Sequence, residues 1–61
     1  MKRRAFIAHL RLNGSELIRE GAKHSWWRNP RNGSRSAVPR HTEISDALCK
    51  KISRDLGIQT P

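Results

Sequence analysis

Residues 15–39 read SELIREGAKHSWWRNPRNGSRSAVP, and this stretch decides the fold. Two short segments, 15–20 and 24–28, contain aliphatic or aromatic residues typical of strands and are separated by a glycine-containing turn. The NPRNG segment at 29–33 predicts a second turn, because proline presets one turn dihedral and Asn-Gly accepts a positive φ. A third strand is expected over 35–38, closed by the proline that follows. The stretch therefore predicts an antiparallel meander of three strands.

An amphipathic helix is predicted on each side of this meander. The first covers 2–13 and ends at an Asn-Gly pair, and the second begins after Ser45 as N-cap and ends at Gly57. Helix, three strands and helix in this order predict an α+β fold, with both helices on one face of a three-stranded antiparallel sheet and the other face open. The apolar stripe of the first helix consists of Phe6, Ile7 and Leu10. That of the second repeats every four residues and starts just before the cap, at Ile44, Leu48, Ile52 and Leu56.

Length and charge together indicate a large anionic partner. A chain of 61 residues is expected to form a single domain over 1–61, too small to enclose an active-site cavity as well as a core. Lys and Arg total 13 against 5 Asp and Glu, which gives a formal net charge of +8. Such a surface attracts nucleic acid, an anionic membrane or an acidic protein. Any chemistry is expected on an open face.

The sequence also predicts where the protein resides and which sites it lacks. Its single cysteine excludes an internal disulfide, which fits a reducing cytoplasm. Residues 1–4 look like the start of a signal peptide, but His9 and Arg11 interrupt the segment that follows. No run approaches the ~20 apolar residues needed to cross a bilayer. The three histidines and Cys49 show no metal-ligand spacing, so we expect a soluble cytoplasmic protein without a metal site or membrane span.

The second predicted strand carries the side chains best suited to catalysis and ligand binding. Alternation places His24, Trp26 and Arg28 on one face and Trp27 on the other. The first set combines an acid/base group, an aromatic ring and a cation, and we expect it to face outward while Trp27 packs under the helices. The alternative is that both tryptophans lie in the core, because a domain this small needs large apolar side chains there. By residue chemistry alone, a histidine here is more often solvated or bonded to a turn than catalytic.

Ribonuclease chemistry would need few groups, because RNA supplies its own nucleophile in the ribose 2′-hydroxyl. The protein must remove that proton, neutralise charge on the phosphate and hold the reacting atoms in line. A histidine can exchange protons near neutral pH, and Lys and Arg can bind phosphate. The candidate set is His24 as the catalytic residue, with Lys23, Trp26, Arg28, Arg40 and His41 as RNA-binding residues, His41 being also the candidate for a second acid/base group.

Four segments of the chain resemble, in order, the HicA family of toxins. They read RRAFIAHLRLNG at 3–14, REGAKHSWWRNPRNG at 19–33, VPRHTEIS at 38–45 and KKISRDLGI at 50–58. The most specific part is Gly-x-x-His before an aromatic strand, followed by the Asn-Gly turn and then Val-Pro-Arg-His. Together these segments cover nearly the whole chain.

The resemblance implies a double-stranded-RNA-binding-like α-β-β-β-α fold, which agrees with the order of elements predicted above. It also implies cleavage of mRNA without a metal or organic cofactor, with the family's essential histidine at His24, and inhibition by a HicB-type antitoxin that masks the toxin. The main alternative is a module that binds double-stranded RNA through shape and backbone without cutting it. A small DNA-binding protein is a weaker alternative, because no helix-turn-helix pattern is present.

Overall fold

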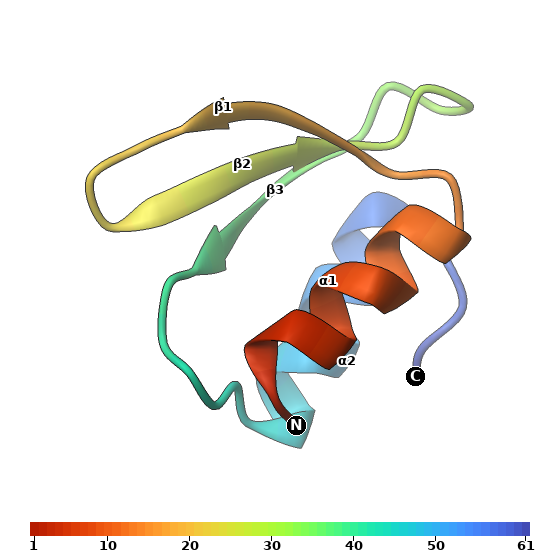
Figure 1. The fold of residues 1–61 in the computed structure, drawn as a ribbon. Coiled ribbons are helices and arrows are strands. Elements are labelled where there is room, and N and C mark those ends of the chain that lie inside the picture. Colours follow the sequence, from red (N-terminus) through yellow and green to blue (C-terminus); the bar gives the residue numbers. More distant parts are fainter.

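The computed structural model describes residues 1–61 and has the α-β-β-β-α order expected from the sequence (Figure 1). Both helices lie on the same side of one antiparallel sheet, whose strand order is β1-β2-β3. The predicted fold class is therefore confirmed, and the far face of the sheet is uncovered. The elements are α1 (Arg3–Leu12), β1 (Glu16–Glu20), β2 (His24–Arg28), β3 (Arg35–Pro39) and α2 (Asp46–Leu56).

Two strand boundaries differ from the prediction by one residue, each for a local reason. Ser15 lies outside β1 because its backbone N–H donates to the Leu10 carbonyl, 2.9 Å away, in the chain reversal that ends α1. The predicted strand ends before Pro39, but in the structure Pro39 is the last residue of β3 and pairs with His24. Proline has no N–H to donate, and it is tolerated there because β3 is an edge strand.

The two predicted stop signals and the predicted N-cap are all present. The Ser45 hydroxyl accepts a hydrogen bond from the Leu48 N–H at 3.2 Å, which satisfies one free donor of the first turn of α2. Gly57 ends that helix with a φ of +68°, a conformation that favours glycine. Gly14, directly after the C-cap residue Asn13, follows α1 with a φ of +88°. The predicted Asn-Gly turn between β2 and β3 likewise has Gly33 at a φ of +74°. Neither helix has the length and apolar character required to cross a membrane.

The hydrophobic core lies between the sheet and the two helices. The Trp27 side chain enters it from β2 and is only 2% exposed, as the alternation predicts. Cys49 is buried in this core, and its burial raises the pKa of the thiol. A thiol with a raised pKa is not an activated nucleophile, so Cys49 serves in packing. The core consists of Phe6, Leu10, Trp27, Val38, Ile44, Cys49, Ile52 and Leu56, with Ile7, Leu48 and Ile58 packed at its edge.

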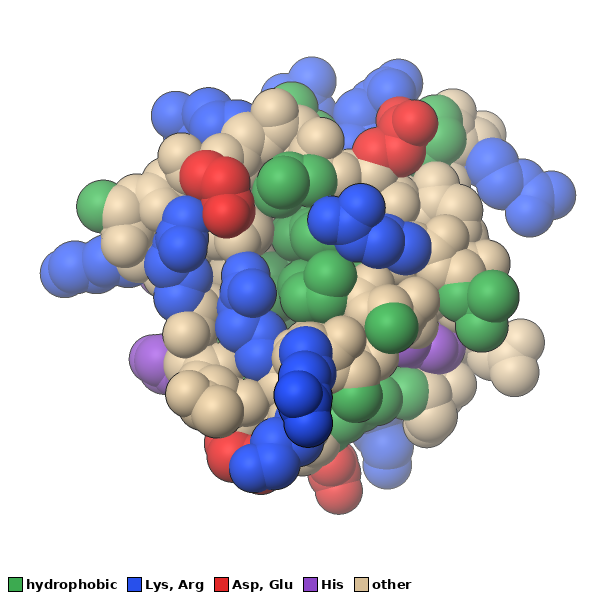
Figure 2. All heavy atoms as spheres, in the orientation of Figure 1, with side chains coloured by type: hydrophobic (Ala, Val, Ile, Leu, Met, Phe, Trp, Pro, Cys, Tyr) green, Lys and Arg blue, Asp and Glu red, His purple; other side chains and the backbone are tan.

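Positive side chains are spread widely over the surface, and acidic side chains are few and scattered (Figure 2). This view looks onto the side of the molecule where α1 is in front. Lys and Arg side chains gather there over the beginning of α1 and the adjacent end of the sheet. The charge surplus therefore belongs to the folded surface and reaches the sheet.

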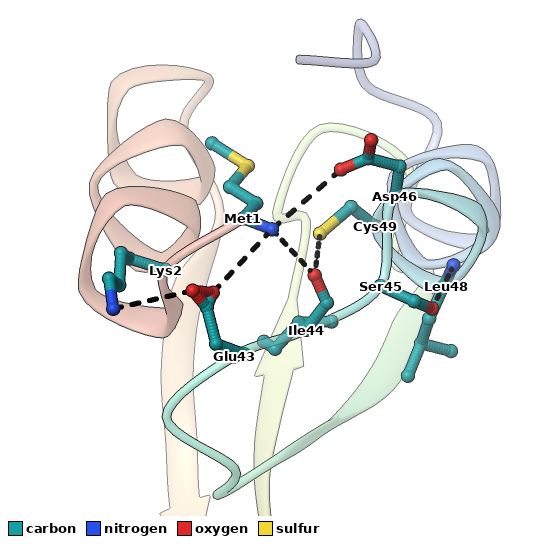
Figure 3. Close-up of polar contacts among 8 residues, drawn as sticks. All are labelled: Met1, Lys2, Glu43, Ile44, Ser45, Asp46, Leu48 and Cys49. Atoms are coloured by element: carbon teal, nitrogen blue, oxygen red, sulfur yellow. Dashed lines mark hydrogen bonds and ion pairs between the residues drawn. The ribbon is translucent and has the colours of Figure 1, made fainter.

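The beginning of α1 is fastened to the segment that leads from β3 into α2 (Figure 3). The Met1 amine donates to the Ile44 carbonyl at 2.9 Å, and the Lys2 ammonium lies 3.3 Å from the Glu43 carboxylate. The Arg3 N–H donates to the Thr42 carbonyl at 2.8 Å. These contacts hold residues 42–44 beside the first turn of α1, although the two segments are far apart in sequence.

Candidate functional site

The outer face of the sheet carries the three β2 residues that the alternation predicts. His24 and Trp26 are exposed there and Arg28 is half-buried, whereas Ser25 and Trp27 point into the molecule. Because β2 is the central strand, neighbouring strands flank this set on both sides. Side chains two residues apart on a strand are roughly 7 Å apart, so the three groups form one continuous row.

His24 has a fixed backbone and a free ring. Its carbonyl accepts a hydrogen bond from the Gly21 N–H at 2.8 Å, and the residue pairs with Pro39 in β3. Its imidazole is exposed and forms no hydrogen bond with the rest of the chain. Both ring nitrogens are therefore available to a ligand, on a backbone that two neighbouring segments hold in place.

The turn before His24 requires glycine at position 21. A Cβ atom added to Gly21 would lie 2.9 Å from the His24 carbonyl oxygen, closer than such atoms approach in proteins. The same oxygen is the acceptor for the Gly21 N–H, so the turn cannot open to make room without losing that hydrogen bond. This close approach gives a physical reason for the Gly-x-x-His spacing.

Arg40, which follows β3, contacts the same turn. Its Nε donates to the Gly21 carbonyl at 3.1 Å, and its Nη2 lies 3.1 Å from the Glu20 carboxylate. Arg40 follows β3 directly, so the folded chain brings it to the turn that carries His24. From the sequence, Arg40 and His24 are candidate residues of one site. In the structure, Arg40 contacts the turn that precedes His24.

A polar cluster that the sequence does not reveal lies behind the turn. Arg3 of α1 donates from Nη2 to the Ser25 hydroxyl at 2.7 Å and from Nε to the Pro39 carbonyl at 2.9 Å. Glu20 is the cross-strand partner of Ser25 on the inner face. A hydrogen bond from Ser25, and then the charges of Arg40 and Arg3, lower the pKa of the Glu20 carboxyl below its ordinary value. Glu20 therefore remains a carboxylate at neutral pH and keeps Arg40 in position.

Trp26 lies on the surface, so the alternative that placed both tryptophans in the core is wrong. Its side chain is 38% exposed and lines a shallow hollow of about 220 Å³ with Ile18, Arg19 and Arg35. The Arg19 guanidinium carbon lies 6.0 Å from the centre of the indole ring. An exposed aromatic ring in a hollow that two arginines line is suited to stacking on a nucleobase.

The outer face also brings like charges together. Arg28 of β2 and Arg35 of β3 are direct cross-strand partners on this face. Glu16 of β1 is the partner of Arg28 on its other side, but it forms no ion pair with Arg28. Like charges in such positions repel each other, and a bound anion would relieve the repulsion. The alternation that placed Arg28 outward could also have identified Arg35, because the register makes them neighbours.

Two candidate residues lie at the periphery of this face. Lys23 is exposed in the turn that precedes His24. His41 is exposed two residues beyond Pro39, the partner of His24, and its ring makes no hydrogen bond with His24. No cluster of three or more His, Cys, Asp or Glu side chains has a geometry that could hold a metal ion.

Comparison with protein families matches residues 3–58 to the family described as the HicA toxin of bacterial toxin-antitoxin. The chain belongs to the HicA toxin family. The match extends from the first residue of α1 to just beyond α2, so the elements of this HicA toxin described above all lie within it. No curated protein and no solved structure gives a significant match to the chain.

Proposed function

We propose that this HicA toxin is an endoribonuclease that cleaves mRNA in the cytoplasm without a metal or organic cofactor. The observation that carries the proposal is the free, solvent-facing imidazole of His24 on an open sheet face rich in arginine. Membership of a toxin family supplies the setting in which such an activity would stop growth.

His24 would act on the ribose-phosphate backbone as a general acid/base. As a base it removes the proton from a 2′-hydroxyl, whose oxygen attacks the adjacent phosphorus while the bond from phosphorus to the 5′-oxygen breaks. The leaving oxygen takes a proton from a general acid, a role for which His41 is the candidate. Lys23, Arg28 and Arg40 would neutralise charge that develops on the phosphate, and Trp26 would stack on a base.

A HicB-type antitoxin would inhibit the enzyme by covering the same face. The face is not walled in by other elements, so a protein partner can reach His24 directly. The toxin's net charge of +8 favours an acidic partner surface. Electrostatic steering of this kind accelerates association and is weakened by salt.

The cleavage chemistry is tested with purified toxin, purified RNA and excess EDTA. We expect cleavage to continue in EDTA and to give one product with a 2′,3′-cyclic phosphate or 3′-phosphate and another with a 5′-hydroxyl, because the 2′-hydroxyl is the nucleophile. An RNA of the same sequence that is methylated at every 2′-oxygen should remain intact. Binding of RNA without any cleavage would instead support the alternative of a non-catalytic module for double-stranded RNA.

A further inference from the structure

A second basic feature lies beside the turn that carries His24. It is an open hollow of about 450 Å³ between the beginning of α1 and the segment after β3, lined by Lys2, Arg3, Arg4, Arg40 and Thr42. We propose that this basic hollow binds a backbone phosphate of the RNA next to the site of cleavage. The inference rests on the proposed ribonuclease function. It extends the substrate path beyond the candidate residues, of which only Arg40 lines the hollow.

The hollow has more positive charge than its acidic neighbours can neutralise. Lys2 pairs with Glu43 at 3.3 Å, and Arg40 pairs with Glu20 at 3.1 Å. Arg3 donates to two neutral acceptors, a carbonyl and a serine hydroxyl. Arg4 is exposed and has no hydrogen bond or ion pair from its side chain. Four cations against two carboxylates leave a local surplus that a phosphate would balance.

The backbone at the hollow also favours an anion. The first turn of α1 has no acidic residue and no side-chain cap, and the N–H groups of Arg4 and Ala5 have no acceptor in the structure. Cations near the positive end of a helix dipole are unfavourable unless an anion lies between them. A phosphate oxygen in the hollow would accept from these donors and from the guanidinium of Arg4.

The basic hollow is continuous with the site of the proposed reaction. Arg40 lines the hollow and also donates to the carbonyl of Gly21, in the turn that positions His24. Arg3 lines it and donates to the carbonyl of Pro39, the strand partner of His24. An RNA strand with its reactive ribose at His24 would therefore pass over Arg40 into the hollow. This continuity favours RNA over a carboxylate of the antitoxin as the source of the anion.

The experiment measures binding of fully 2′-O-methylated RNA, which cannot be cleaved, at several salt concentrations. The test variant replaces Lys2 and Arg4 by alanine, because both side chains are exposed. It removes the Lys2–Glu43 ion pair but keeps the hydrogen bonds from Met1 to Ile44 and from Arg3 to Thr42 that fasten the start of α1. The control replaces Lys50 and Arg54, two exposed cations of α2 outside the hollow, with the same loss of charge. We expect the test variant to bind more weakly and to reduce the slope of log Kd against log salt by about 1, equally for two unrelated RNA sequences. The control should keep the wild-type slope.

Equal slopes for the test and control variants would overturn the basic hollow as a phosphate site, even if the toxin cleaves RNA as proposed. Slopes that change for one RNA sequence only would also contradict it, because a phosphate contact carries no base specificity. If the wild-type toxin binds no RNA at all, the proposed function itself fails. The two failures are therefore distinguishable from the same titrations.

Discussion

Replacing Phe6 by alanine should leave the toxin largely unfolded at room temperature. Phe6 is fully buried in the core between the sheet and the helices, and Phe→Ala substitutions in cores cost about 3–5 kcal/mol through lost burial and the cavity left behind. A core in a chain of this size rarely supplies more than about 3–5 kcal/mol in total. No disulfide adds to it, because Cys49 is the chain's single cysteine.

Urea unfolding followed by far-ultraviolet circular dichroism measures this effect. The matched control is Leu12→Ala, which removes an apolar side chain from the same helix at a position that is 86% exposed. Its free energy of unfolding should stay within about 0.5 kcal/mol of wild type. A cooperative transition in Phe6→Ala with a loss below about 1 kcal/mol would mean that the core is not packed as described.

Replacing His24 by alanine should reduce RNA cleavage by about 10²–10⁴-fold, the range typical of positioned proton transfer. The fold should survive, since the ring is exposed and forms no hydrogen bond within the chain. Single-turnover cleavage of purified RNA in EDTA measures the loss, and circular dichroism verifies the fold. Cells that express the variant without antitoxin should continue to grow.

The control for this variant is His9→Ala. His9 lies on α1, where its Nε2 is 2.7 Å from the Gln59 carbonyl, and it takes no part in the sheet face. Its loss should leave the cleavage rate close to that of wild type. His41→Ala tests the candidate for the second acid/base group and should also slow cleavage. A folded His24→Ala protein that cleaves RNA at the wild-type rate would remove His24 from the reaction.

Much of the fold is predictable because its signals are local. The Asn-Gly pairs, the Ser45 cap and the strand alternation each depend on a few neighbouring residues, and together they predicted the elements to within one residue at the boundaries discussed above. Alternation also predicted that His24 faces outward and Trp27 inward, because a strand directs successive side chains to opposite faces.

The polar cluster behind His24 could not be predicted in the same way. Arg3 reaches Ser25 and Pro39 across 22 and 36 positions of sequence, and such contacts exist only once the helix has docked on the sheet. In the sequence, nothing distinguishes Arg3 from the other cations of the predicted first helix. The exposure of Ile18 also follows from tertiary structure, because β1 is an edge strand with an irregular register at that point.

The position of RNA on the toxin is tested most directly by the ring resonances of its three histidines in nuclear magnetic resonance spectra. Wild-type toxin is titrated with 2′-O-methylated RNA, so that binding is observed without cleavage. We predict that the His24 resonances shift and saturate with the added RNA, whereas those of His9, on the helical side, stay in place. Unchanged His24 resonances under saturating RNA would contradict a reaction at this face of the sheet.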